Sequence, residues 1–123
     1  MGRRGRRRRG EPGLAAPDSD YPDAEGNVLT LRGAMSASTR REYAAVRAGQ
    51  RSAAAAARED DWQRAVEFLF ERLAVRWVIA GAPIERQKEL LARLRFASPV
   101  ERAWVRKALR EHCAEHFPEI EAP

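Results

Sequence analysis

The sequence has one cysteine in 123 residues, which excludes an internal disulfide and is typical of a reducing compartment. Long apolar runs are absent too: nowhere do about 18 uncharged apolar residues follow one another, as a membrane-spanning helix requires. Arg3 and Arg4 form a twin-arginine pair, but no apolar run of about 7–15 residues follows them, as an export signal would need. We therefore expect a cytoplasmic protein with no membrane partner.

Motifs of common enzymatic chemistry are also missing. The sequence contains no P-loop, no glycine pattern of a dinucleotide site and no G-x-S-x-G nucleophile turn. Lysine occurs only twice against 21 arginines, a bias that we attribute to codon usage in a GC-rich, bacterial genome. These absences favour a non-enzymatic protein that needs no cofactor.

The positive charge is confined to the N-terminus. The net charge is +5, but six arginines lie in the first ten residues, so that residues 11–123 sum to −1. Guanidinium groups at this density neutralise phosphates without reading a base sequence, and no aromatic residues lie among them to stack on single-stranded bases. We take these arginines as candidate nucleic-acid contacts: Arg3, Arg4, Arg6, Arg7, Arg8 and Arg9.

The first 26 residues hold few apolar side chains, so burial cannot offset the entropy lost on ordering them, and we predict disorder there. The β-preferring run Asn27 to Leu31 is expected to lie against the body as an extended arm. Residues 1–35 are therefore predicted to be a disordered tail followed by this arm.

The stretch from Trp62 to Ala80 organises the rest of the chain. Its apolar residues recur at helical spacing, which predicts a central helix from about Asp60 to a stop at Gly81. One broad face is predicted to be core, and it comprises Trp62, Ala65, Val66, Leu69, Phe70, Leu73, Trp77 and Ala80.

Three further helices are indicated by caps and periodicity. Thr39 and Glu42 have capping-box spacing for a helix from Arg40 that Gly49 ends. Apolar spacing predicts a helix from Ile84 to Arg95, and Ser98 with Glu101 caps a last helix from Pro99 to His116. The predicted fold is all-α: a small bundle of about four helices over residues 36–117, with a C-terminal tail at 118–123.

A second, narrower apolar stripe lies on the far side of the predicted central helix. It consists of Phe68, Val75 and Ile79, which we take as candidate interface residues. A bundle this small leaves them exposed, and a twofold dimer would bury them. The competing interpretation is that the arm or the first helix covers this stripe and that the protein is a monomer.

The segment from His112 to His116 satisfies the H-x-x-E-H pattern of some zinc hydrolases, with Glu115 as the water-activating group. However, no acidic ligand on a later helix follows, and both histidines continue the apolar face of Val105 and Leu109. We expect no metal and no catalytic residue, with His112 and His116 as the metal candidates to check. Cys113 lacks an evident substrate cleft for a nucleophile.

The last two predicted helices, over residues 84–116, resemble a helix-turn-helix, with a row of arginines along the second helix: Arg102, Arg106 and Arg110. These are candidate nucleic-acid contacts. Val100 and Trp104 lie where base reading is expected, yet both look like core. An arginine row is also the ordinary solvated face of an amphipathic helix.

The run from Ser36 to Tyr43 (SASTRREY) is similar to the start of the helical core-binding domain of tyrosine recombinases, which often opens with a Ser-x-x-Thr-x-x-x-Tyr run. The resemblance covers eight residues. Nothing in the chain matches that family's catalytic domain with its nucleophilic tyrosine, so no activity is transferred.

These observations predict a small non-enzymatic interaction module, either a protein–protein adaptor or a homodimer, whose arginine-rich tail contacts polyanions. The alternative is a DNA- or RNA-binding protein that uses the tail and the unit 84–116. A zinc-dependent hydrolase ranks third.

Overall fold

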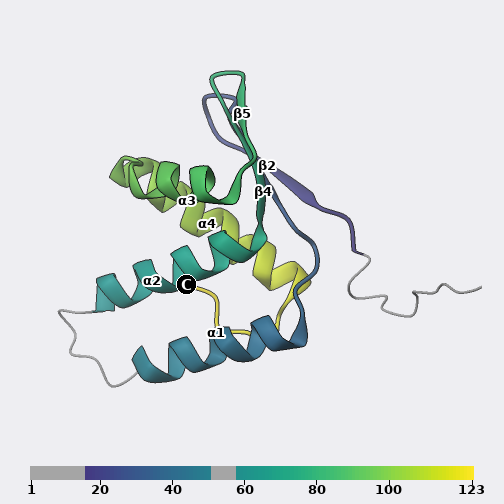
Figure 1. Ribbon diagram of the computed structural model, residues 1–123, viewed down its shortest axis with the longest axis vertical. Helices are drawn as coiled ribbons and strands as arrows, with labels where there is room; N and C mark the ends of the chain where they lie inside the picture. The colour runs from purple at the N-terminus through teal and green to yellow at the C-terminus, as the bar shows by residue number, and fades with distance from the viewer. Residues whose placement is uncertain (1–15, 51–57) are drawn as a thin grey trace, which may run out of the picture.

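The computed structural model describes residues 16–50 and 58–123 (Figure 1). These residues form four helices and four strands, and the strands make one antiparallel sheet in the order β2-β3-β4-β5. The prediction of an all-α bundle is therefore wrong, because the fold is mixed α/β. In chain order the elements are β2 Ser19–Pro22, β3 Val28–Leu31, α1 Ala37–Gln50, α2 Arg58–Leu73, β4 Ala74–Ile79, β5 Ala82–Ile84, α3 Gln87–Arg95 and α4 Pro99–His116.

The predicted central helix is a helix followed directly by a strand. Helix α2 ends at Leu73 and β4 begins at Ala74. The strand is rich in β-branched residues and includes Trp77, a composition that favours extended backbone. Val75 and Ile79 are four residues apart, a spacing that places two side chains on one side of a helix or a strand alike. Periodicity alone could not separate the two structures there.

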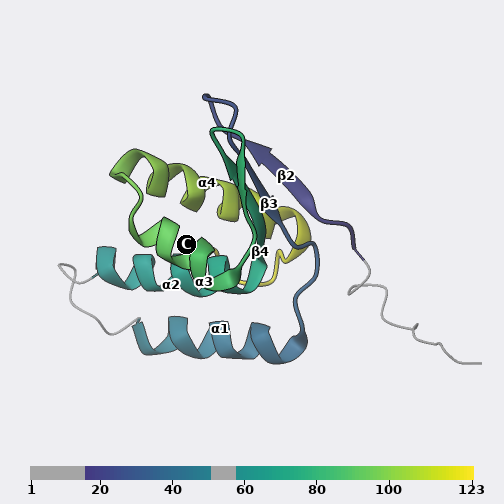
Figure 2. The same cartoon turned by 45° about the horizontal axis from the view of Figure 1, so that its top comes forward.

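Gly81 lies in a hairpin turn rather than at a helix end. Ile79 pairs with Ala82, so Ala80 and Gly81 form a two-residue loop, and their φ angles are 52° and 80°. Two positive φ angles are the signature of the type I′ turn that matches the twist of a hairpin. The Ala80 N–H donates to Asn27 Oδ1 at 2.9 Å, and both hairpin tips project together from the helices (Figures 1 and 2).

Ala80 has a left-handed backbone conformation, in which its Cβ crowds the backbone. The strain at this position leads to a prediction about stability. Replacing Ala80 by glycine is expected to raise the free energy of unfolding by about 0.5–1 kcal/mol in urea titrations. The matched control, Ala82→Gly in β5, should lower it by a similar amount, since glycine weakens a strand. A loss of stability in both variants would contradict the turn geometry.

Part of the N-terminal segment that was predicted to be disordered is ordered. Residues 19–22 form β2, and β3 lies inside the sheet between β2 and β4. Leu29 and Leu31 are fully buried, so β3 is a core strand rather than an arm resting on the surface. Residues 1–15, which include the arginine block, lie outside the described residues, and the predicted disorder there stays a prediction.

The inner face of the sheet is apolar, whereas the outer face has one polar row and one apolar row, the latter formed by Pro22, Val28, Val78 and Pro83. A row of directly paired residues crosses all four strands on the inner face, and each member belongs to or packs on the hydrophobic core: Tyr21, Leu29, Trp77 and Ile84. The neighbouring row on the outer face is polar, and in it the Thr30 hydroxyl donates to Asp20 Oδ1 at 2.7 Å, with Arg76 next to Thr30. The helices cover the inner face and share one core with it.

The helix boundaries follow from local caps. Helix α1 begins earlier than predicted because Ser36, not Thr39, is the cap: its Oγ accepts the Thr39 N–H at 3.1 Å. Helix α3 begins later than predicted, since Ile84 belongs to β5. Helix α4 has the predicted bounds, and the capping box of Ser98 and Glu101 is present. None of the helices in residues 16–50 and 58–123 is long and apolar enough to cross a bilayer.

Candidate functional site

His112 is a buried structural contact between α4 and the sheet. Its Nδ1 lies 2.8 Å from the Tyr21 hydroxyl on β2, and its Nε2 lies 2.8 Å from the Arg32 carbonyl oxygen just after β3. A carbonyl oxygen only accepts, so Nε2 carries the proton and the Tyr21 hydroxyl donates to Nδ1. Burial lowers the pKa of His112, partly opposed by the bond to Arg32, which favours the neutral form of the ring in the folded protein.

His116 lies beside His112, with 4.4 Å between the ring centroids, and its Nε2 is 3.4 Å from Ser19 Oγ. The structure thus brings the two metal candidates together. Metal binding by this pair would require His112 to give up a hydrogen bond, because both of its nitrogens are engaged. Within the described part of the chain, no group of three or more His, Cys, Asp and Glu side chains is placed to hold a metal ion.

Cys113 is buried, and desolvation raises its thiol pKa to about 12. The nucleophilic form of cysteine is the thiolate, which reactive sites stabilise by lowering this pKa. The environment of Cys113 acts in the opposite direction. Its side chain packs in the hydrophobic core near the C-terminal end of α4.

The three interface candidates do not form one stripe. Phe68 is on α2, where the Tyr43 ring lies 5.9 Å from its centroid and the Arg72 guanidinium 4.3 Å. Val75 and Ile79 are on β4, and Phe68 and Ile79 are partly buried against the core. The surface on which the dimer prediction was based is therefore divided between two elements. Self-association itself stays an untested prediction.

The three α4 arginines contact their own chain. Arg102 Nη1 donates to the Ala97 carbonyl at 2.8 Å, Arg110 Nε donates to the Pro123 carbonyl at 3.0 Å, and the Arg106 guanidinium lies 5.1 Å from the Trp62 ring centroid. With Lys107 and Gln63 they line an open, basic pocket of about 420 Å³ between α2 and α4. The tail arginines at positions 3, 4 and 6–9 lie outside the described residues.

The structure also exposes apolar residues that were not among the predicted site residues. Phe96 is 90 % exposed and Val100 is 79 % exposed, although Val100 was predicted to be core. Phe96 is the C-terminal cap of α3 and Val100 lies in the first turn of α4, whose residues Pro99 and Ala103 line the basic pocket. We call this surface the α3–α4 corner, with the members Phe96, Pro99, Val100, Arg102, Ala103, Arg106, Lys107 and Arg110.

Sequence position does not explain this exposure. Phe96 lies between the last residue of α3 and the cap of α4, but Ala97 in the same segment is buried. Phe117 follows the last residue of α4 in the same way and is 1 % exposed.

Comparisons with known proteins add no relative. No protein-family model matches the sequence, and searches of curated proteins and of solved structures find nothing similar to it. A functional interpretation therefore has to start from the geometry of the chain itself.

Proposed function

We propose that the protein is a small, non-enzymatic interaction module of the cytoplasm that binds an acidic segment of a partner protein at the α3–α4 corner. The observation that carries this proposal is the exposure of Phe96 and Val100 in the segment that leads into α4, the helix whose arginines and lysine line a basic pocket. Isolated exposed apolar residues are common on protein surfaces. A large aromatic, a valine and a proline gathered at one corner are less so, and such patches commonly mark interaction sites.

The charges around the corner determine the chemistry of the partner. No acidic side chain of the described residues lines the pocket, whose charged members are Arg102, Arg106, Lys107 and Arg110. Glu101 and Glu111 flank this row in sequence; Glu101 is paired with Arg93 at 2.7 Å, and neither of them lines the pocket. An acidic segment with an apolar anchor residue complements this surface, with Phe96 as the central contact and the cations at the rim.

The same basic pocket supports nucleic-acid binding as a second candidate function. Arg102 and Arg110 each donate one of their five N–H groups to a carbonyl of their own chain, so both keep donors for a phosphate or a carboxylate alike. The exposed Phe96 and Val100 separate the two candidates, since they suit an apolar anchor better than a phosphate backbone. For this reason the protein partner is the leading proposal.

The test is quantitative co-purification of the tagged full chain from the cells that make it. The Phe96→Ser and Lys107→Glu variants are each expected to reduce recovery of the partner protein, roughly tenfold for a central contact such as Phe96. Lys88→Glu, at an exposed position of α3, is the matched control for the charge change and should have no effect. Recovery of nuclease-sensitive material that Lys107→Glu removes and Phe96→Ser leaves would support nucleic-acid binding instead.

The same variants separate binding from folding. Because Phe96 and Val100 are largely exposed, Phe96→Ser and Val100→Ser should each change the free energy of unfolding by less than about 0.5 kcal/mol. Denaturant titration measures this directly. A loss of several kcal/mol in either variant would mean that the residue is part of the core. That result would contradict the proposal that the α3–α4 corner is a binding surface.

A further inference from the structure

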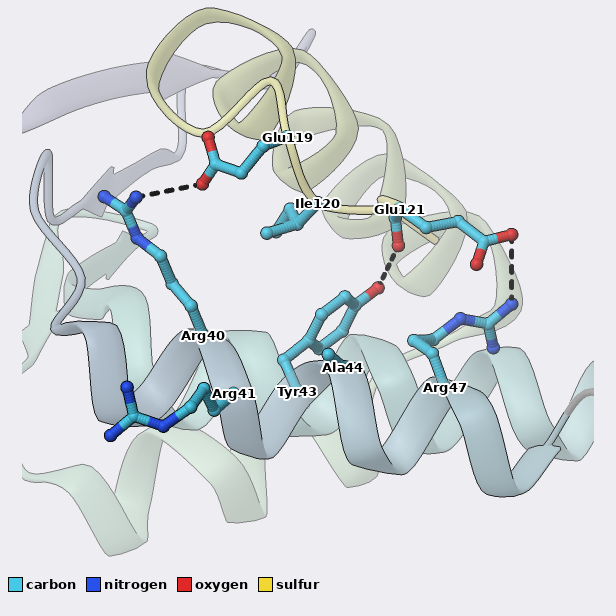
Figure 3. Close-up of a pocket in the computed structure, with 8 residues that line it drawn as sticks. All are labelled: Arg40, Arg41, Tyr43, Ala44, Arg47, Glu119, Ile120 and Glu121. Carbon is cyan, nitrogen blue, oxygen red and sulfur yellow. Dashed lines mark hydrogen bonds and ion pairs between the residues drawn. The ribbon is translucent and has the colours of Figure 1, made fainter.

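Helix α1 presents an aligned set of polar side chains to the C-terminal residues 117–123, which we call the C-terminal strap. Arg40 Nη1 lies 3.0 Å from a Glu119 carboxylate oxygen, and Arg47 Nη2 lies 3.8 Å from a Glu121 carboxylate oxygen. Between them the Tyr43 hydroxyl donates to the Glu121 carbonyl oxygen (Figure 3). Arg40, Tyr43 and Arg47 are three and four residues apart, which places them along one side of α1.

Each arginine is also held by a group outside the strap, although the Arg40 guanidinium lies 5.2 Å from the ring centroid of Phe117, the first strap residue, as well. Arg40 Nε donates to the Met35 carbonyl oxygen at 3.2 Å, before α1 begins. The Arg47 guanidinium lies 3.8 Å from the Trp62 ring centroid on α2. Both cations are therefore held ready for a carboxylate pair, which lowers the entropy cost of binding one.

The strap does not fill the space above α1. An open pocket of about 310 Å³ remains there, lined by both arginines, Tyr43 and Ile120 and also by Arg41 and Ala44. Arg41 has no carboxylate partner among the residues that the structure describes. The side chains of Glu119 and Glu121 are about half exposed, at 52 % and 51 %, so water weakens both ion pairs.

From this geometry we infer that the face of α1 formed by Arg40, Tyr43 and Arg47 is a docking site for an extended acidic segment of a partner protein. This partner segment carries an aliphatic residue between two carboxylates. In the structure the site is occupied by the Glu119-Ile120-Glu121 sequence of the strap, which has the same pattern. The argument for this occupant is charge complementarity: Arg40 and Arg47 face the carboxylates of Glu119 and Glu121, whereas the Arg41 guanidinium points away from the strap (Figure 3). Arg110 of the α3–α4 corner donates to the Pro123 carbonyl of the strap, but different variants test the two proposals: Phe96→Ser and Lys107→Glu for the corner, and Arg40→Ala for α1.

The test uses the full chain and a fluorescein-labelled peptide with the sequence of residues 117–123 (FPEIEAP), followed by fluorescence anisotropy. Glu119→Gln with Glu121→Gln weakens the strap, so the peptide should bind this variant roughly three- to tenfold more tightly than the unmodified chain. Arg40→Ala should reduce binding several-fold, and added salt should weaken it. The same peptide with glutamine at both glutamates should not bind.

Two controls keep the result interpretable. Arg86→Ala removes an exposed arginine away from α1 and should leave binding unchanged. Arg47 is itself buried, so the more exposed Arg40 carries the test if Arg47→Ala fails to fold. Equal binding of the glutamine peptide, or binding that Arg40→Ala leaves unchanged, would overturn the inference. A concentration-dependent dimer of the unmodified chain that the double glutamine variant abolishes would also overturn it, because the occupant would then be a second copy.

Discussion

Replacing Trp77 by alanine is expected to lower the free energy of unfolding by about 3–5 kcal/mol. The Trp77 ring is 1 % exposed on β4, where it meets Phe70 of α2 at a centroid distance of 5.8 Å and the Arg93 guanidinium of α3 at 5.3 Å. It also pairs with Leu29 and Ile84 across the sheet. Alanine would leave a cavity where the sheet and two helices meet. Chemical denaturation followed by circular dichroism measures the effect.

Trp77→Phe is the matched control. The Trp77 Nε1–H is buried without a hydrogen-bond partner in the described part of the chain, so phenylalanine removes an unpaired donor and keeps an aromatic ring. We expect it to cost less than about 1.5 kcal/mol. If alanine and phenylalanine proved equally mild, Trp77 could not be at the centre of the core.

Lowering the pH from 7.5 to 5.5 is expected to destabilise the protein through His112. Burial lowers the pKa of His112 in the folded chain below the ordinary value of 6.5, so the unfolded chain binds the additional proton. Stability is therefore fully present above about pH 6.5 and falls on acidification, by up to about 1.4 kcal/mol for each pH unit between the two pKa values. Below the folded-state pKa the effect of this residue levels off.

His112→Gln isolates this contribution. Glutamine does not titrate and retains a nitrogen that can donate to the Arg32 carbonyl. The free energy of unfolding of this variant should therefore be lower than that of the unmodified protein but nearly independent of pH between 7.5 and 5.5. His112→Ala should lose about 2–4 kcal/mol because the Tyr21 hydroxyl and the Arg32 carbonyl lose their partner.

Two carboxylates titrate in a separate, lower range. Hydrogen bonding to Arg93 lowers the pKa of Glu101, and hydrogen bonds from the Asn27 side chain and nearby amides lower that of Asp23 against an opposing effect of burial. Their contribution to stability is lost only as the pH falls below their ordinary pKa values of 4.5 and 3.8.

If His112→Gln showed the same loss of stability between pH 7.5 and 5.5 as the unmodified protein, that loss could not be assigned to His112.

Local signals predicted the helices better than the sheet. Helix α4 was predicted with its correct bounds because Ser98, Pro99 and Glu101 form a cap that acts within one turn. Strand β2 carries no comparable local signal, since its four residues include Asp20 and Pro22 and it is ordered by pairing with β3. Strand β4 was hidden because the spacing of Val75 and Ile79 suits both periods. Sheet formation here depends on pairing between residues that lie far apart in the chain.

The candidate surfaces were predictable only in part. The sequence identified the arginines of α4, but the carbonyls that Arg102 and Arg110 contact depend on the tertiary fold. The position of His112 on the apolar face of the last helix indicated that its imidazole is buried. The sequence did not indicate its hydrogen-bond partners, Tyr21 on β2 and Arg32 after β3. The pairing of α1 with the strap joins residues nearly 80 positions apart, beyond the reach of any local pattern.

The most direct test of the proposed function is site-specific photocrosslinking in the cells that make the protein. A photoreactive benzoylphenylalanine is placed at position 96 and, as a control, at the exposed position 88 of α3. We predict a discrete adduct with an acidic protein from position 96, lost when Lys107→Glu is added, and none from position 88. A nucleic-acid adduct at position 96, or equal labelling from both positions, would contradict a protein-binding α3–α4 corner.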